Sequence, residues 1–188
     1  FELGDTLAPD DVHGDGDFSS FTYDAAKPGS WVKPTQDQVG FTSQALDQPV
    51  AMAGPGSVEL WVRADAEDVD LQVTLSEVRP DGYEMLIQSG WLRASHRALD
   101  EEASTPLRPV HRHTEESLEK LTPGEWTKVR IELFPFAHVF RQGSKIRLMV
   151  SGPGGGSNAW PWAYDSLPGG FDVRIGHDDE HESVAVLP

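Results

Sequence analysis

Alternation of apolar and polar side chains with a period of two is the sequence feature that most constrains the fold of this chain. The clearest examples are residues 57–63, 70–76, 128–133 and 145–150. Successive side chains of a β-strand point to opposite faces, so each segment predicts a strand with one face turned toward a core. The apolar residues that we expect to be mostly buried are Val58, Leu60, Val62, Leu71, Val73, Leu75, Val129, Ile131, Leu133, Ile146, Leu148 and Val150.

Turn signals and the lack of helical periodicity extend this pattern. Residues 79–82 read Arg-Pro-Asp-Gly and predict a tight turn into a strand over about 84–91, because proline sets φ and glycine supplies a positive φ. Residues 173–175 and 184–186 predict two more short strands, and residues 114–121 a turn or two. No internal repeat of roughly 20 to 50 residues supports a propeller or solenoid.

The expected fold class is therefore all-β, with about eight to ten short strands. We expect a jelly-roll β-sandwich of two antiparallel sheets packed face to face, with a closed barrel as the alternative. Residues 135–138 (Pro-Phe-Ala-His) are expected to interrupt the strands with a short helical turn, because Pro135 has no N–H for a sheet ladder. His138 is expected to hold that turn through a backbone carbonyl.

The first 38 residues lack the alternation. Acidic residues precede the first cation, Lys27, and Gly, Pro and Ser are interleaved among them, a composition typical of a linker or long surface wrap. We expect residues 1–38 to be a linker or wrapping segment from a preceding domain, and residues 39–188 to form the β-sandwich. The chain starts at Phe1 without a signal-peptide pattern, and we expect it to be a piece of something longer.

Charge and cysteine content exclude several classes of function. The chain has 31 acidic and 15 basic residues, for a net charge of −16, which argues against nucleic acid or an anionic membrane as a partner. No apolar run approaches the roughly 18 to 20 residues of a membrane-spanning helix. Absence of cysteine excludes disulfides, thiolate metal sites and cysteine nucleophiles. It fits a cytoplasmic compartment and is only weak evidence against secretion.

Two motifs imitate catalytic sites. Residues 155–159 (Gly-Gly-Ser-Asn-Ala) resemble a serine nucleophile elbow, but the last position is not glycine and Trp160-Pro161-Trp162 stands where a helix should begin. Residues 177–181 (His-Asp-Asp-Glu-His) fit the H-x-x-E-H pattern of some metallopeptidases. No helix of useful length fits around them, so we expect an acidic turn, with adventitious zinc or nickel binding by His177 and His181 as the alternative.

Two further motifs are weaker. His111-Arg112-His113 places two imidazoles on one side of an extended segment without a third ligand nearby in the sequence. Asp11, Asp15 and Asp17 do not follow the order of an EF-hand loop, although some jelly rolls bind structural calcium. We therefore predict no catalytic residue, no metal site and no cofactor in this chain.

The densest aromatic cluster lies in a Gly-rich loop. Exposed aromatic side chains on a β-sandwich can stack on sugars or anchor another domain, and they can also fold inward as core. We favour docking or core over sugar binding, since tryptophan is generally enriched at interfaces. The residues that we predict at a domain interface are Trp160, Trp162, Tyr164, Phe18, Phe21, Tyr23, Trp31, Arg93 and Arg97.

Several segments also carry a family resemblance, in order along the chain and with plausible spacing. They are residues 57–66, 70–82, 90–97, 104–109, 121–125, 133–143 and 146–148. Together they resemble the C-terminal domain of the X-prolyl dipeptidyl-peptidase and cocaine-esterase family of serine hydrolases, from about Val39 onward. His177-Asp178 and His181 look like the closing segment of that family. The resemblance implies a galactose-binding-like jelly roll that follows an α/β-hydrolase domain. The catalytic triad of the family lies in that other domain, so none of its residues is carried onto this sequence.

These observations give a ranked set of functional expectations. The first is a non-catalytic accessory domain of a serine hydrolase, which packs on the α/β-hydrolase domain, shapes its active-site entrance and supports contacts between copies. The parent would act on esters, amides or X-Pro peptides, while this chain alone would be inactive. The second is a stand-alone carbohydrate-binding module. The third and weakest is a metal-dependent hydrolase using His177 and His181.

Overall fold

Every period-two segment becomes a strand in the computed structural model, which describes residues 7–9, 17–24, 38–153, 167 and 169–188. The four segments are β4 (Val50–Ala64), β5 (Asp70–Val78), β7 (Thr127–Phe140) and β8 (Lys145–Ser151). The strand expected after the Arg-Pro-Asp-Gly turn is β6 (Glu84–Arg93). Gly82 in that turn has a φ of 83°, which a residue with a Cβ rarely adopts.

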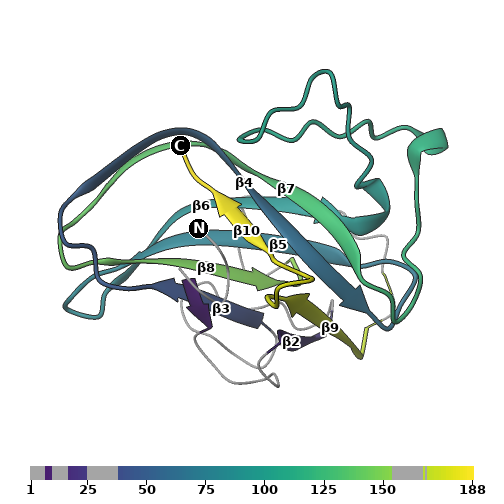
Figure 1. Ribbon diagram of the computed structural model, residues 1–188, viewed down its shortest axis with the longest axis horizontal. Helices are drawn as coiled ribbons and strands as arrows, with labels where there is room; N and C mark the ends of the chain where they lie inside the picture. Colours follow the sequence, from purple (N-terminus) through teal and green to yellow (C-terminus); the bar gives the residue numbers. More distant parts are fainter. Residues whose placement is uncertain (1–6, 10–16, 25–37, 154–166, 168) are drawn as a thin grey trace.

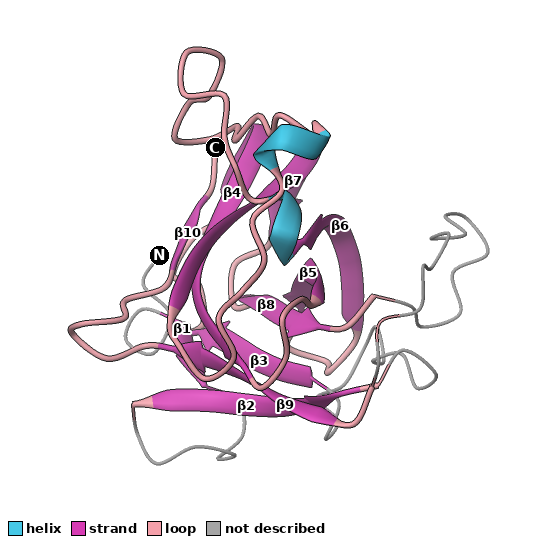
Figure 2. Cartoon of the chain, turned by 90° about the vertical axis from the view of Figure 1, so that its right-hand side faces the viewer, coloured by secondary structure: helices cyan, strands magenta, loops and turns pink. Residues whose placement is uncertain are grey.

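The strands form two antiparallel sheets, seen from two sides in Figures 1 and 2. One has the order β1-β3-β8-β5-β6, where β1 is Leu7–Pro9 and β3 is Gln38–Ser43. The other has the order β10-β4-β9-β2, with β7 also paired to β4. Its remaining strands are β2 (Phe18–Tyr23), β9 (Phe171–Gly176) and β10 (Val184–Val186). The prediction of an all-β sandwich is confirmed.

Helical structure is confined to two short 3-10 turns among the described residues. They are η1 (Ala94–His96) and η2 (Glu115–Ser117), and the second lies in the segment expected to form a turn or two. No helix in this part of the chain has the length and apolar character needed to cross a membrane.

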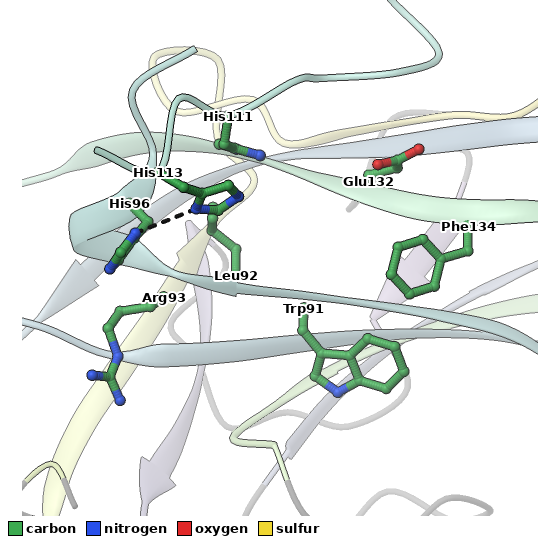
Figure 3. Close-up of a pocket in the computed structure, with 8 residues that line it drawn as sticks. All are labelled: Trp91, Leu92, Arg93, His96, His111, His113, Glu132 and Phe134. Carbon is green, nitrogen blue, oxygen red and sulfur yellow. Dashed lines mark hydrogen bonds between the residues drawn. The ribbon is translucent and has the colours of Figure 1, made fainter. Parts of the chain in front are cut away.

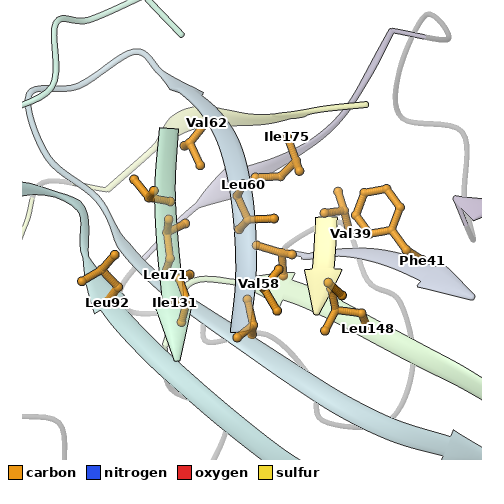
Figure 4. Packing of buried hydrophobic residues seen from close by; sticks show 14 of the residues in the cluster. Val39, Phe41, Val58, Leu60, Val62, Leu71, Leu92, Ile131, Leu148 and Ile175 are labelled. Carbon is orange, nitrogen blue, oxygen red and sulfur yellow. The ribbon is translucent and has the colours of Figure 1, made fainter. Parts of the chain in front are cut away.

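The core lies between the two sheets. All the apolar residues that the alternation predicts to be buried are buried. Figure 4 shows how β4 contributes Val58, Leu60 and Val62 to this core, together with Leu71 and Leu148 from the other sheet. Burying one such side chain stabilises a fold by about 1.5–3 kcal/mol, so the alternation accounts for much of the driving force toward this architecture.

The prediction of a helical turn over residues 135–138 is wrong. Strand β7 runs through Pro135, at a place where the pairing with β4 shifts register between Gly54 and Gly56. In the described residues β7 pairs only with β4, so it is an edge strand. Proline is tolerated at edges and bulges because the missing N–H interrupts no ladder bond there.

His138 bonds a carboxylate rather than the expected backbone carbonyl. Its Nε2 lies 3.1 Å from Glu77 Oε2, and the backbone N–H of Arg141 donates to Glu77 Oε1 over 2.9 Å. The Glu77 side chain is fully buried. Burial alone raises the pKa of Glu77, but the hydrogen bonds, led by that from Arg141, outweigh it and lower the pKa to about 2.

The edge strands of the two sheets meet along one side of the sandwich, where β6 lies beside β7. A Cβ at Gly90 of β6 would lie 2.8 Å from the carbonyl carbon of Glu132 in β7, and closer still to its oxygen. Farther along the same strands, Gln88 Nε2 donates to the Pro135 carbonyl over 3.3 Å. We call this seam the β6/β7 junction, and glycine at position 90 permits its close approach.

Two strands, β1 and β2, lie within the first 38 residues, where the sequence did not predict them. Strand β1 pairs with β3, and β2 pairs with β9. Leu7, Phe21 and Tyr23 are buried in the core of the sandwich. The N-terminal segment thus contributes strands to both sheets. Its further assignment as a segment arriving from a preceding domain stays a prediction.

Candidate functional site

A pocket of about 390 Å³ opens at the β6/β7 junction (Figure 3). Strand β6 ends there and continues into η1, and a long loop then returns over the end of the sheets toward β7. The pocket is therefore built from an edge strand of each sheet and the loop between them. Its lining residues are Trp91, Leu92, Arg93, His96, His111, His113, Glu132 and Phe134.

One half of the pocket is aromatic. The rings of Trp91 and Phe134 lie 5.8 Å apart between centroids, and Figure 3 shows them on the side away from His96 and His113. The Trp91 Nε1–H donates to Gln72 Oε1 over 2.9 Å, which fixes the indole ring. Phe134 is 42% exposed, so this half presents apolar surface to whatever covers it.

The other half holds three imidazoles. His96 Nδ1 and His113 Nδ1 lie 3.3 Å apart, and the rings of His111 and His113 have centroids 5.6 Å apart. Burial lowers the pKa of His111 and of His113, and the neighbouring imidazoles add to the effect. Both shifts favour the neutral form of these two rings. His113 also has a φ of 51°, in a left-handed region where histidine is enriched over most non-glycine residues.

The sequence pattern singles out His111 and His113 but does not predict the pocket. The third imidazole, His96, comes from the other end of the loop, and no short motif joins it to them. Glu132 and Phe134 lie on β7, and the sequence of this strand does not distinguish its outward face from that of any other exposed strand. The one available signal was Gly90, since glycine inside a strand often marks close approach of another backbone.

Arg93 and Arg97, both predicted interface residues, make ion pairs within this domain. Arg93 binds the buried Asp70 in a bidentate pair, with Nε–Oδ1 and Nη2–Oδ2 distances of 2.7 and 2.8 Å. That hydrogen bonding raises the pKa of Arg93. Arg97 pairs with Glu119 over 3.0 Å and also donates to the Ala94 carbonyl. Arg93 lines the pocket, and the assignment of both residues to a domain interface stays a prediction.

The predicted aromatic interface residues lie in different places. Phe21 and Tyr23 are buried, and Tyr23 stacks on Phe171 with centroids 5.0 Å apart. Phe18 is half-buried beneath two guanidinium groups, those of Arg63 and Arg174. The others, Trp31, Trp160, Trp162 and Tyr164, lie outside the described residues, as do Ser157, Asp11 and Asp15.

Residues 177–181 form the expected acidic turn rather than a metallopeptidase helix. The carboxylate of Asp178 accepts hydrogen bonds from the backbone N–H groups of Glu180 and His181. His177 Nε2 instead contacts the Ser19 hydroxyl over 3.2 Å, while the His181 ring stacks on Trp126. Within the described part of the chain, no group of three or more His, Asp or Glu side chains could hold a metal ion.

The outer face of the β10-β4-β9-β2 sheet carries a row of aromatic and imidazole rings with the Arg63 guanidinium among them. Arg63 lies between Phe18 and Trp126, at 5.5 and 4.7 Å from their ring centroids. His181 follows Trp126, with its edge toward Trp61. Cation–π contacts of this kind contribute about 0.5–1 kcal/mol each at exposed sites, so the row ties β2 and β4 to two loops.

Comparison with known proteins identifies the domain. The sequence model of the family described as the X-Pro dipeptidyl-peptidase C-terminal non-catalytic domain matches residues 3–155. The chain is 31% identical over 152 residues to a Mycobacterium bovis protein whose name describes it as an inferred serine esterase. It is 27% identical over 164 residues to the cocaine esterase of a Rhodococcus species. These alignments cover 79% and 81% of this chain but only 23% and 25% of the relatives.

Solved structures agree on the fold. A CocE/NonD family hydrolase from Staphylococcus aureus superposes with a TM-score of 0.70 at 23% identity, covering 92% of this chain and 37% of that one. An α-amino acid ester hydrolase superposes with a TM-score of 0.69 at 19% identity, covering 94% of this chain and 33% of that one. Identities this low show the fold alone.

The resemblance read from the motifs is thus confirmed by a match that spans most of the chain. In homologues this domain follows a catalytic hydrolase domain in the same polypeptide. The chain itself spans about a quarter of the length of the curated relatives that it matches. It belongs to the family of C-terminal non-catalytic domains of X-Pro dipeptidyl-peptidases and related CocE/NonD hydrolases.

Proposed function

We propose that this chain is the accessory domain of a longer serine hydrolase, where it packs on the α/β-hydrolase domain and shapes the active-site entrance. The parent acts on esters, amides or peptides with an N-terminal X-Pro unit. Family membership supports the accessory role, because the family is described as non-catalytic. The short span relative to the curated relatives supports a catalytic domain outside these residues.

The observation that carries the proposal is exposed apolar surface at the β6/β7 junction. Of the five large hydrophobic side chains exposed among the described residues, four lie on β6, on β7 or in the turn before β6. They are Tyr83, Leu86, Phe134 and Val139, with exposed fractions of 56%, 43%, 42% and 56%. We call them, with Trp91, the junction surface.

Side-chain contacts hold both ends of the junction surface in place. At one end, Trp91 and Phe134 lie together in the pocket. At the other, Arg79 lies over the Tyr83 ring and also pairs with Glu77, which bonds His138 next to Val139. Apolar patches of this kind on soluble domains commonly mark interaction sites. An interdomain interface typically buries about 600–1,500 Å². The junction surface can form the apolar centre of an interface of that size.

Residues predicted from the sequence extend this interface. Trp31, Trp160, Trp162 and Tyr164 remain candidates, together with Phe18 on the outer face of its sheet. Phe21 and Tyr23 are buried in the core of this domain. The proposed interface therefore uses the junction surface in place of these two residues. Arg93 borders that surface through the pocket.

Hydroxyl-radical footprinting tests the docking directly, because it reports the solvent access of individual side chains. The 188-residue chain alone is compared with the same residues in the full-length parent enzyme. We expect Leu86 and Phe134 to be strongly protected in the parent. Leu118 offers a matched control, since it is 44% exposed and lies beside η2, away from β6 and β7. Equal labelling of Leu86 and Phe134 in both samples would refute docking on this surface.

A second measurement addresses the active-site entrance. In the full-length parent, Phe134→Ala is expected to change KM for a large ester or X-Pro substrate, while Leu118→Ala leaves it unchanged. If neither variant alters KM or kcat, the domain does not shape the entrance through this surface. Binding of glycans to the isolated chain with micromolar affinity would instead favour a carbohydrate-binding module.

A further inference from the structure

We propose that the pocket at the β6/β7 junction receives the guanidinium group of an arginine side chain from the catalytic domain of the parent enzyme. This inference rests on the domain docking proposed above, and it names the chemical group that the pocket takes up. Three features of the described residues carry it: a weakly paired carboxylate in the pocket wall, a pair of aromatic rings beside it, and a cationic wall residue that is already neutralised.

Glu132 supplies the carboxylate. It lies on β7 and lines the pocket, with Phe134 on the same strand (Figure 3). Its side chain is only 25% exposed, and its one ion pair among the described residues is with Arg108, over 3.5 Å. Arg108 is 63% exposed, and solvent screening makes pairs with such partners weak. Because partly buried charges in proteins are usually paired, Glu132 favours a cation that enters from another domain.

The aromatic half of the pocket suits a flat cation. The rings of Trp91 and Phe134 have centroids 5.8 Å apart and planes inclined by 46°, and Phe134 is 42% exposed. A guanidinium stacks on aromatic faces, and its planar fork also bonds a carboxylate bidentately. A lysine ammonium is a compact and strongly hydrated charge that matches such faces less well. The combination of Trp91, Phe134 and Glu132 therefore points to arginine.

The other half of the pocket does not oppose a cation. Arg93 is bound by the buried Asp70 in a bidentate pair, so the two charges balance. Burial lowers the pKa of His111 and of His113, which favours their uncharged forms. An anionic group would instead be repelled by the Glu132 carboxylate. The charge pattern of the pocket therefore favours a cationic occupant.

The size of the pocket and the charge of the whole chain agree with this occupant. The volume of about 390 Å³ lies at the small end of the roughly 300–1,000 Å³ of ligand pockets, which suits a single long side chain. The net charge of −16 attracts a basic surface during docking. Arginine and tryptophan are also among the residues that most often anchor interfaces. The pocket thus becomes the anchor point of the junction surface.

The first test titrates the 188-residue chain with N-acetylarginine amide and follows the indole N–H resonance of Trp91 by NMR, assigned through Trp91→Phe. We expect saturable shifts with a Kd on the order of a few mM, as for one small group in an open pocket. N-acetylcitrulline amide has nearly the same shape without the charge, and should bind at least about fivefold more weakly. Equal binding of the two probes would overturn the proposal, as would tighter binding of the amide of N-acetylglutamate.

Variants locate the binding site of the arginine probe. Glu132→Gln should weaken binding at least about fivefold, because a neutral amide accepts weaker hydrogen bonds. Phe134→Leu removes the aromatic face but keeps an apolar side chain, and should weaken binding about two- to fivefold. Glu180→Gln is the control, since it makes the same charge change at an exposed residue that does not line the pocket. Unchanged Tm values confirm folding, and equal effects of Glu132→Gln and Glu180→Gln would overturn the proposal.

The second test identifies the arginine in the full-length parent. Phenylglyoxal modifies accessible guanidinium groups, and mass mapping locates the modified residues. We expect one arginine outside residues 1–188 to become at least about fivefold more reactive in Glu132→Gln, because its charged hydrogen bonds are lost, and not in Glu180→Gln. If Leu86 and Phe134 are protected in the parent but no arginine responds, the arginine assignment is overturned while docking stands. If Leu86 and Phe134 are not protected, docking fails and this inference fails with it.

Discussion

Replacing the buried Glu77 should lower the free energy of unfolding, because its ionised carboxylate stabilises the fold. Its pKa is about 2 in the folded chain, against an ordinary value of 4.5. Each pKa unit corresponds to about 1.4 kcal/mol, so the difference gives an upper value of about 3 kcal/mol. Two partners, Arg79 and His138, are each 19% exposed, and solvent screening at such groups reduces the expected contribution to about 2 kcal/mol.

The sign of the pH dependence follows from the lowered pKa. The ionised carboxylate stabilises the fold fully above pH 4.5, the ordinary value, and this contribution is lost as pH falls toward about 2. Urea unfolding of the wild type and Glu77→Gln should therefore differ by about 2 kcal/mol at pH 7. The difference should shrink steadily between about pH 4.5 and 2.

The variant comparison isolates this group from the other acidic residues, because their titration is common to both proteins. Glu116→Gln serves as the control, since Glu116 is exposed in η2, and it should change the unfolding free energy by less than about 0.5 kcal/mol. A gap between wild type and Glu77→Gln that stays constant from pH 7 to 3 would show that the Arg141 and His138 bonds do not stabilise the ionised form.

Two other outcomes follow from the structure. Gly90→Ala should cost at least about 2–3 kcal/mol in urea unfolding, because its Cβ overlaps the Glu132 carbonyl. Gly124 is the control, because a Cβ added there meets no atom within 4 Å and only the positive φ opposes it. Gly124→Ala should cost about 1–2 kcal/mol. Equal costs for Gly90→Ala and Gly124→Ala would contradict the argument. The 188-residue chain should not hydrolyse p-nitrophenyl esters or X-Pro anilides. Turnover that co-purifies with the chain and disappears in Ser157→Ala or His177→Ala would contradict this prediction.

The strands with a buried face could be predicted because a half-buried strand must alternate. Val58, Leu60 and Val62 reveal their strand without knowledge of its neighbours. Strands β1 and β2 could not be found this way. The first has three residues, and the second pairs with β9 near the other end of the chain. Their place depends on partners that local sequence does not specify.

The pocket was less predictable than the core for a related reason. Its walls meet only because the edge strands of two different sheets approach at Gly90. No periodicity within β6 or β7 encodes that meeting. The error at Pro135 has the same origin, since the sequence shows that proline donates no hydrogen bond but not that β7 lies at an edge, where none is needed.

The pairing of β2 with β9 sets the order in which this domain can be completed during synthesis. Thr22 and its partner Asp172 are 150 positions apart, and ribosomes add about 5–20 residues per second. Strand β9 is therefore synthesised roughly 8–30 s after β2. Phe21 and Tyr23 lack their final covering for that time, and β4 lacks β10 until residues 184–186 are added. Slow or interrupted translation of the codons for residues 169–188 should yield insoluble product even when every earlier strand is intact.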